Sequence, residues 1–422
     1  MCKILRNSYK MVAVRRREEA MKPDESQVKP EQSKPGNYRQ TAFQLIMLLG
    51  VVSMFGDIAY EGGRSISGPY LATLGASAAV VGLVTGAGEF LGYALRLLSG
   101  YLADRTKAYW LLTFIGYGLI GAIPLLAFAG NWQLAALLLI LERIGKAIRS
   151  PARDTIISYA GKNIGRGWGF AIHEAMDQVG AIIGPLVLSF ALITSGGYRR
   201  GFNLLWIPVV LCLAALIIAN RKAPVPERLE AKVETDKQKA KGGLGRVFWL
   251  YGIFVLLAGT GFASFQLIAY HVKAQAIISD ARIPILYAIA MGVDAVVALI
   301  IGKSYDKWGL MVLFTIPALT LPIPFLGFSH TYWQIILAIV LWGAVMGIHE
   351  TIMRAAIADL VPIERRGSAY GIFNTLYGLS LFLGSAAMGF LYEVSATYIM
   401  VFAVVMELVS IPALFLIRRS RS

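Results

Sequence analysis

Long apolar runs recur along the whole chain, and they constrain the fold more than any other feature. Each is long enough, at roughly 20 residues, to cross a lipid bilayer as a helix. The runs fall at 41–73, 77–101, 109–129, 132–160, 166–195, 201–220, 247–271, 282–302, 310–329, 332–358, 367–393 and 396–417. The sequence lacks the ~10-residue alternating segments of a β-barrel. It therefore predicts an all-α membrane protein with twelve transmembrane helices.

Composition supports this prediction and narrows the function. Hydrophobic residues make up 57% of the chain and charged residues 15%, whereas soluble domains carry about 25% charged residues. The net charge of +15 comes from Lys and Arg clustered in tails and short connections, which is the positive-inside pattern. We therefore expect the partners to be the lipid bilayer and a small-molecule substrate, with no nucleic acid. Metal-ligand spacing and a nucleotide loop are both missing, so we predict no cofactor and no enzymatic activity.

A polar segment divides the apolar runs into two groups of six. This segment, 221–246, carries eight Lys/Arg, and an even number of spans places it on the same side as both termini. Because all three are basic, we predict that they lie in the cytoplasm and that the chain lies in the plasma membrane. The expected parts are a disordered basic tail over 1–40, six-helix bundles over 41–220 and 247–417, and a short tail over 418–422.

The two groups of six also repeat one another. A Gly-x-x-x-Asp-[Arg/Lys] motif follows the second run in GYLADRTK and returns in GKSYDKWG, offset by 202 residues. The motif residues are Gly100, Asp104 and Arg105 in the first copy, and Gly302, Asp306, Lys307 and Gly309 in the second. The stretches 166–184 and 366–384 align without a gap. A duplicated six-helix unit is the architecture in which a binding site forms between the halves.

With these motifs the chain resembles the major facilitator superfamily over roughly residues 41–417. The loop motif of that family is close to Gly-x-x-x-Asp-Arg-x-Gly-Arg-Arg. The first copy departs from it at Lys107 and Ala108, whereas the second keeps Gly309. The stretch RIGKAIRSPARDTIIS (143–158) resembles a Gly-Lys-x-x-Arg-x-x-x-Arg-Asp segment of a largely uncharacterised prokaryotic branch of the superfamily.

The resemblance implies two pseudo-symmetric six-helix bundles whose helices 1, 4, 7 and 10 line a central cavity. It also implies that the loop carboxylates Asp104 and Asp306 latch the cytoplasmic side closed; the alternative is that they are solvated loop charges. GAIIGP (180–185) resembles the core of an antiporter motif, in which Gly180, Gly184 and Pro185 bend the helix. The Gly-Gly that normally follows that core is replaced by Leu188 and Ser189.

Charged residues inside the first run need a physical explanation, because a charge in hydrocarbon is expensive. Asp57, Glu61 and Arg64 follow steps of four and three and therefore share one helical face. If this face borders a wet cavity, burial and a neighbouring cation act in opposite directions on a carboxyl's pKa, and such a carboxyl can exchange a proton. The alternative places Glu61 and Arg64 at the external interface, with Asp57 deeper in the membrane.

Further charged residues lie within the other runs. Glu142, Lys146, Arg149 and Arg153 form one polar stripe on the fourth run, which we interpret as an internal ion pair or a cavity wall. Glu89 on the second run and Glu174 and Asp177 on the fifth add acidic groups. The second half offers Asp294, His349, Glu350, Arg354 and Glu407. We expect the proton chemistry mainly in the first half; the alternative is interhelical pairing of polar groups.

The sequence thus predicts a monomeric secondary transporter that works by alternating access and exports a small organic solute in exchange for protons. A first alternative is uptake of an anionic metabolite, by symport or exchange, with Lys146 and Arg149 as the anion-binding residues. A second alternative is a membrane receptor or scaffold without transport activity.

Overall fold

The computed structural model describes residues 35–162, 164–195, 197–229, 244–361 and 365–420. Contacts divide the chain into Met1–Gln40 and Thr41–Ser422, and the helices of interest belong to the second unit. The predicted basic tail up to residue 34, and residues 230–243 of the predicted linker, lie outside the described residues.

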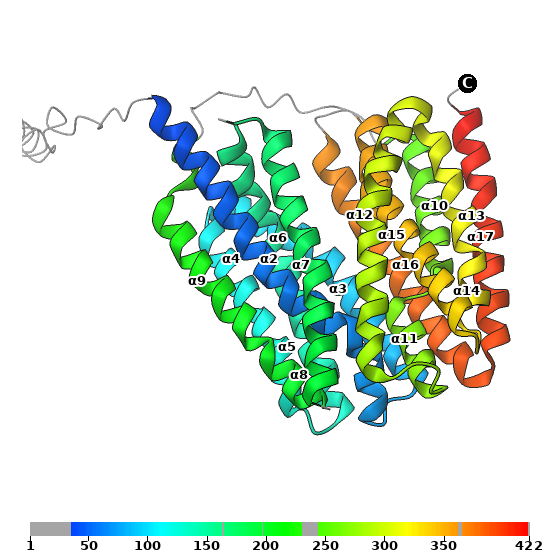
Figure 1. Cartoon of the computed structure of the whole chain (residues 1–422). Helices are drawn as coiled ribbons and strands as arrows, with labels where there is room; N and C mark the ends of the chain where they lie inside the picture. Colours follow the sequence, from blue (N-terminus) through cyan, green and yellow to red (C-terminus); the bar gives the residue numbers. More distant parts are fainter. Residues whose placement is uncertain (1–34, 163, 196, 230–243, 362–364, 421–422) are drawn as a thin grey trace, which may run out of the picture. The chain divides into compact units, whose positions relative to one another are not determined.

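Helices account for nearly all of the described residues (Figure 1). The first half contains α2 (Pro35–Thr73), α3 (Ala78–Thr106), α4 (Tyr109–Gly118), η1 (Leu119–Gly121), α5 (Ala122–Leu125), η2 (Leu126–Phe128), α6 (Trp132–Gly161), α7 (Arg166–Ser195), α8 (Tyr198–Leu204) and α9 (Trp206–Lys222). The second half contains α10 (Arg246–Gly261), α11 (Phe265–Ala274), α12 (Ile283–Trp308), η5 (Gly309–Phe314), α13 (Thr315–Thr320), α14 (Pro322–Gly327), α15 (Tyr332–Leu360), α16 (Arg366–Val394) and α17 (Ala396–Arg419). Short 3-10 segments η3 (Pro226–Leu229) and η4 (Asp280–Arg282) lie in connections.

Ten of the described stretches are long and apolar enough to cross a membrane. One of them, Asp280–Gly327, contains two successive spans, because η5 separates α12 from α13 and α14. The 30-residue α6 is also long enough to cross a membrane, but a stripe of charges makes it less apolar than these ten stretches. Dividing the one stretch and adding α6 gives the twelve spans that the sequence predicts.

The repeat is visible in the helix packing as well as in the sequence. A Cβ placed on Gly184 of α7 would lie 2.4 Å from the carbonyl oxygen of Ile58 on α2. A Cβ on Gly384 of α16 would lie 2.5 Å from the carbonyl oxygen of Thr260 on α10. The fifth and first helices of each half therefore approach to backbone contact at matching positions, as small residues allow in membrane helices.

Both copies of the loop motif end their helix at a residue with positive φ, although ψ is 18° at Lys107 and −141° at Gly309. Lys107 ends α3 with φ 54° and donates its backbone N–H to Ala103. Gly309 ends α12 with φ 55° and bonds to Tyr305. Only glycine adopts positive φ without steric cost, so Lys107 occupies a position for which Gly, present in the second copy, is better suited.

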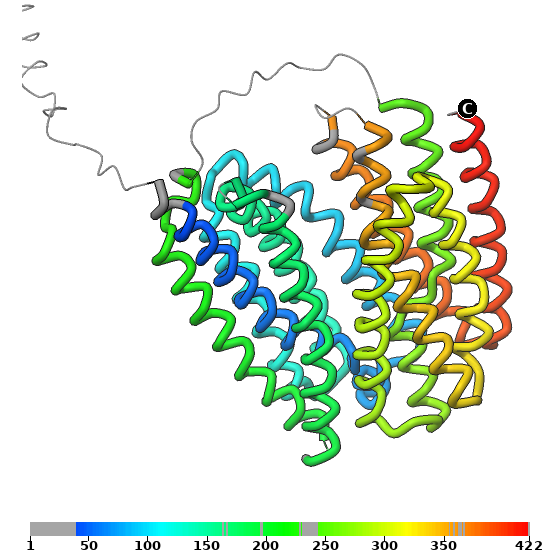
Figure 2. Tube along the Cα trace, turned by 45° about the horizontal axis from the view of Figure 1, so that its top comes forward, coloured from blue at the N-terminus to red at the C-terminus, as the bar shows by residue number. Residues whose placement is uncertain are grey.

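The two halves meet along one side and separate along the other. In Figure 1 the last turn of α9, the first turn of α10 and the C-terminal end lie at the same end of the bundle, which we call the linker end. The helices α3 and α16 pack closely from Gly82 against Ser385 near the opposite, distal end up to Leu97 against Gly371. Figure 2 shows α7 and α12 diverging toward the linker end.

Contacts between the halves close the distal end. Ser189 on α7 donates a hydrogen bond to the carbonyl of Ala281, and Tyr198 donates to the carboxylate of Asp280. A Cβ on Gly68 would lie only 2.1 Å from the carbonyl oxygen of Gln266. The structure is therefore sealed at its distal end.

Candidate functional site

A chamber lies between the halves on the linker side of this seal. Its inner part has a volume of ≈ 140 Å³ and is lined by residues such as Asp57, Lys146 and Asp177. Its outer part has a volume of ≈ 750 Å³ and lies between α6, α7, α12 and α15. The two parts share the lining residues Arg153, Asp154, Glu174, Gln178, Asp294 and Glu350. We call the combined space the central chamber.

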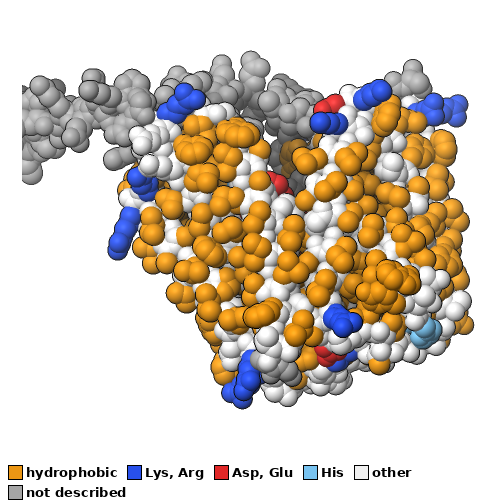
Figure 3. All heavy atoms as spheres, viewed as in Figure 1, with side chains coloured by type: hydrophobic (Ala, Val, Ile, Leu, Met, Phe, Trp, Pro, Cys, Tyr) orange, Lys and Arg blue, Asp and Glu red, His pale blue; other side chains and the backbone are white. Residues whose placement is uncertain are grey.

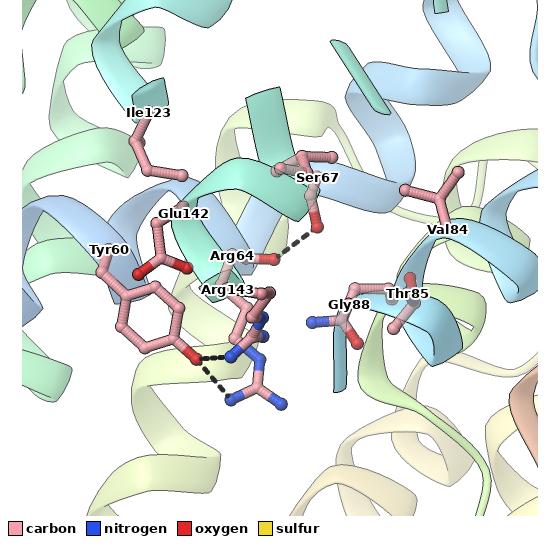
Figure 4. Close-up of a pocket in the computed structure, with 11 residues that line it drawn as sticks. Tyr60, Arg64, Ser67, Val84, Thr85, Gly88, Ile123, Glu142 and Arg143 are labelled. Atoms are coloured by element: carbon pink, nitrogen blue, oxygen red, sulfur yellow. Dashed lines mark hydrogen bonds between the residues drawn. The ribbon is translucent and has the colours of Figure 1, made fainter. Parts of the chain in front are cut away.

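Glu89 on α3 holds two arginines from different helices, and one of them, Arg64, lines the inner chamber. Its Oε1 lies 2.8 Å from Nη2 of Arg64 and 2.9 Å from Nη2 of Arg143. The hydroxyl of Tyr60 accepts hydrogen bonds from the same two arginines (Figure 4). Because one carboxylate serves two guanidinium groups, α2, α3 and α6 are tied together in the interior of the first half.

Glu61 connects the two halves. Its Oε2 accepts a hydrogen bond of 2.7 Å from the hydroxyl of Tyr287 on α12, and it lies 3.8 Å from Nη1 of Arg64. Glu61 is 7% exposed. The first-run charges that the sequence singled out therefore border the interior, and Glu61 belongs to the contacts that hold the halves together.

The predicted stripe on α6 divides into separate pairs. Glu142 pairs with Arg149 at 3.2 Å, and both side chains are buried. Arg149 also donates to the carbonyl of Gly116. Lys146 places its Nζ 4.3 Å from the ring centre of Tyr60 and lines the chamber. The Glu142–Arg149 pair thus fixes the helix packing. Lys146, Arg149 and Arg153 all line the chamber, and of these three Lys146 is the one without an ion pair to the described carboxylates.

Arg153 brings two further first-half acids, Asp154 and Asp177, into one group. Its guanidinium lies 2.9 Å from Asp154 and 3.8 Å from Asp177, and it donates to the hydroxyl of Ser53. Nδ1 of His173 lies 3.3 Å from the same Oδ2 of Asp177, while Oδ1 of Asp177 has no hydrogen-bond partner among the described residues. This group forms one wall of the chamber.

Asp57 and Glu174 face the chamber without direct partners. No hydrogen bond or ion pair joins either carboxylate to the part of the chain that the structure describes. Asp57 lies against α7, since a Cβ on Gly180 would come within 3.0 Å of its Cβ. Both residues line the chamber, which leaves them available to protons or to a bound solute.

The second half also contributes acids to the chamber, whereas the sequence predicts the proton chemistry mainly in the first half. Asp294 is buried at 2% exposure, lines the chamber and has an Oδ1 without a hydrogen-bond partner among the described residues. Glu350 lies on the same wall. The uncharged partners Tyr60 and Tyr287 have roles that depend on which helices meet, and sequence spacing carries no signal for such roles.

The motif residues lie away from the chamber lining. Gly100, Asp104, Arg105, Gly302, Asp306, Lys307 and Gly309 lie near the linker end, on the last turns of α3 and α12 and directly after them. Asp104 and Asp306 are exposed, and neither makes a hydrogen bond or ion pair with the described residues. In α7, Gly180 and Gly184 pack against α2, and the helix continues unbroken through Pro185.

Comparison with known proteins identifies the family of this chain. The profile of the Major Facilitator Superfamily matches residues 46–321 and 278–422. The chain belongs to this superfamily. An uncharacterised protein of Mycobacterium tuberculosis, Rv2265, is 40% identical over 386 residues, which cover 90% of this chain and 94% of the relative. An uncharacterised MFS-type transporter of Methanocaldococcus jannaschii is 27% identical over 86% of this chain and 92% of its own length.

Solved structures agree on the fold. The nucleoside transporter NupG superimposes with a TM-score of 0.65 at 18% identity, covering 89% of this chain and 98% of NupG. Membership of the superfamily makes this chain a multi-pass membrane protein and a secondary transporter of a small molecule, and not an enzyme. Two six-helix halves around a shared chamber are the physical basis of that activity.

Proposed function

We propose that this transporter exports a small organic solute across the plasma membrane in exchange for protons. It would do so as a monomer, with both termini and the linker in the cytoplasm. The two bundles, predicted over 41–220 and 247–417, would rock about the central chamber and expose it to each side in turn. The Lys/Arg-rich linker and tails support this orientation.

The availability of Asp57 and Asp177 is the observation that carries the proton coupling. The two side chains line the same chamber. Asp57 has no direct partner among the described residues. The nearest contacts of Asp177, 3.3 Å to His173 and 3.8 Å to Arg153, are longer than the 2.8–3.2 Å contacts of Glu89 and Glu142. The closely paired Glu89 and Glu142 serve as fixed structural charges. A carboxylate that a proton and a solute can both reach is the element that antiport requires, since binding of one then disfavours the other.

The anion-uptake alternative has weaker support. It requires Lys146 and Arg149 to bind the solute together, but the guanidinium of Arg149 is engaged by Glu142 and by the carbonyl of Gly116. The described lining of the inner chamber also contains seven carboxylates and five cationic side chains, which disfavours an anion. The partial antiporter motif at Gly180, Gly184 and Pro185 further favours export.

Reconstitution tests the proposal directly. Compounds that raise the melting temperature of the purified protein would be offered to liposomes that contain the protein and the trapped pH indicator pyranine. We expect each transported compound to drive proton movement in the opposite direction, and Asp57→Asn or Asp177→Asn to abolish that movement. Glu227→Gln, outside the predicted spans, is the matched control and should behave as wild type. Solute flux that is unaffected by collapse of the pH gradient and by both Asp variants would refute proton antiport.

A further inference from the structure

The central chamber has an opening on one flank of the molecule as well as toward the linker end. Its outer part is lined by Phe170, Ala171 and Ala175 of α7 and by Ala295, Ala298 and Leu299 of α12. Leu299 is 74% exposed and Phe170 39% exposed. On the opposite flank, α3 and α16 remain packed up to Leu97 and Gly371. The opening between α7 and α12 therefore has no counterpart between α3 and α16.

This opening faces the region that the bilayer occupies. Figure 3 views the molecule across its long helices and shows a hollow between two hydrophobic faces, with an acidic side chain at its edge. The flanking surfaces of α7 and α12 expose Val179, Ile183, Val296 and Ile300, as lipid-facing helices do. The lining residues of α7 lie in its linker-side half, and those of α12 extend from the middle of the helix toward the linker end, so the opening is level with one leaflet.

Acidic groups surround the interior behind this apolar rim. The described lining of the outer chamber contains Asp154, Glu174 and Asp294, and its one Lys or Arg is Arg153. Arg153 is already paired with Asp154 and Asp177. Asp294 Oδ1 and His173 Nε2 are buried without hydrogen-bond partners among the described residues. Buried acceptors and carboxylates without enough donors favour a ligand that brings positive charge.

We propose that the solute is an amphiphilic organic cation that reaches the chamber sideways, from the cytoplasmic leaflet, between α7 and α12. The apolar rim accepts its hydrocarbon part, and Glu174 and Asp294, from opposite halves, bind its charged group. Such a molecule concentrates at an anionic leaflet with its charge near the headgroups, at the level of the opening. This inference deepens the proposed function and rests on it for the orientation in the membrane.

Binding at equilibrium tests the charge of the ligand without any pH gradient. Tritiated tetraphenylphosphonium would be added to the full chain in lipid nanodiscs, with tetraphenylborate, of matching shape and opposite charge, as the competitor. We expect micromolar binding of the cation, no competition by the anion, and affinities lowered about tenfold by Glu174→Gln and by Asp294→Asn. Glu174 is exposed, so its variant keeps the test valid if Asp294→Asn fails to fold.

A pair of neighbouring tryptophans tests the route. Leu299→Trp narrows the opening, whereas Ile300→Trp adds the same bulk to the next lipid-facing position of α12, outside the chamber lining. In proteoliposomes we expect Leu299→Trp to slow cation transport at least fivefold while Ile300→Trp leaves it at the wild-type rate. Equal rates for the two variants would overturn the lateral route, and no binding, or equal binding of cation and anion, would overturn the ligand class. Proton coupling fails separately, when the cation binds and moves but pyranine reports no proton exchange.

Discussion

The hydrogen bond between Tyr287 and Glu61 gives a quantitative test of alternating access. Its donor and acceptor belong to different halves, lie 2.7 Å apart and are both buried. Only a state with a closed distal end can form it. Tyr287→Phe removes the hydroxyl and little else, so this substitution should selectively destabilise the state described here.

The size of the effect follows from the chemistry of the bond. A hydrogen bond to a charged group contributes about 1.5–3 kcal/mol, which corresponds to a shift of about 10- to 150-fold in the ratio of two states. Arg64 lies 3.8 Å from the same carboxylate oxygen, so Glu61 keeps one partner after the substitution. We therefore expect a shift near the lower limit, about tenfold, toward the outward-open state.

Electron–electron double resonance can measure this shift. Spin labels at Gly130→Cys and Ala274→Cys, on exposed distal positions of the two halves, would be introduced after Cys2 and Cys212 are replaced by Ser. Tyr251→Phe is the matched control, because the Tyr251 hydroxyl donates a 2.8 Å bond to Met353 within the second half. Tyr287→Phe should enlarge the long-distance population, and Tyr251→Phe should not. Identical distance distributions for the two variants would show that this bond does not govern the distal closure.

Two further predictions concern stability. Lys107→Gly should raise the melting temperature of the detergent-purified protein by roughly 2–4 °C, because glycine removes about 1 kcal/mol of left-handed backbone strain. Lys107→Ala should leave the melting temperature unchanged. A lower melting temperature for Lys107→Gly would contradict the presence of backbone strain at this position. Gly184→Ala and Gly384→Ala should each destabilise the protein by about 1–3 kcal/mol through overpacking against Ile58 and Thr260. Gly292→Ala, where a Cβ meets nothing within 4 Å, should be tolerated, and equal melting temperatures for all three variants would refute the packing argument.

Hydropathy and the internal repeat were sufficient to predict the fold, whereas the site could be predicted only in part. Span length and the Gly-x-x-x-Asp spacing are local properties of the chain. In the structure the apolar runs form helices, and both copies of the motif lie at helix ends. Pairing of charges depends instead on which helices meet. The sequence placed Glu142 and Lys146 on one face, yet Glu142 pairs with Arg149, and Lys146 lies over Tyr60. Asp294 is a single acid on a long apolar helix, and only its position between the halves marks it as part of the chamber.

The two halves repeat their packing but not their charges, and this difference has a physical reason. The offset that relates Ile58 to Thr260 also places Asp57, Glu61 and Arg64 opposite Gly259, Ala263 and Gln266. At the positions where α2 is continuous and charged, the second half has the break between α10 and α11. Within this break, the carbonyl of Ala263 accepts a hydrogen bond from the indole of Trp342.

Both halves need the same close backbone contacts, because each must move as a rigid body. Among the described lining residues, the first half supplies most of the chamber's ionisable groups, and the second half adds the carboxylates Asp294 and Glu350 from α12 and α15 and none from its first helix. The second half is therefore free to use the same positions for a break in its first helix. This break lies next to Gln266, whose backbone meets Gly68 of α2 at the distal seal. The charged segment of α2 in the first half therefore corresponds to an interrupted helix in the second half.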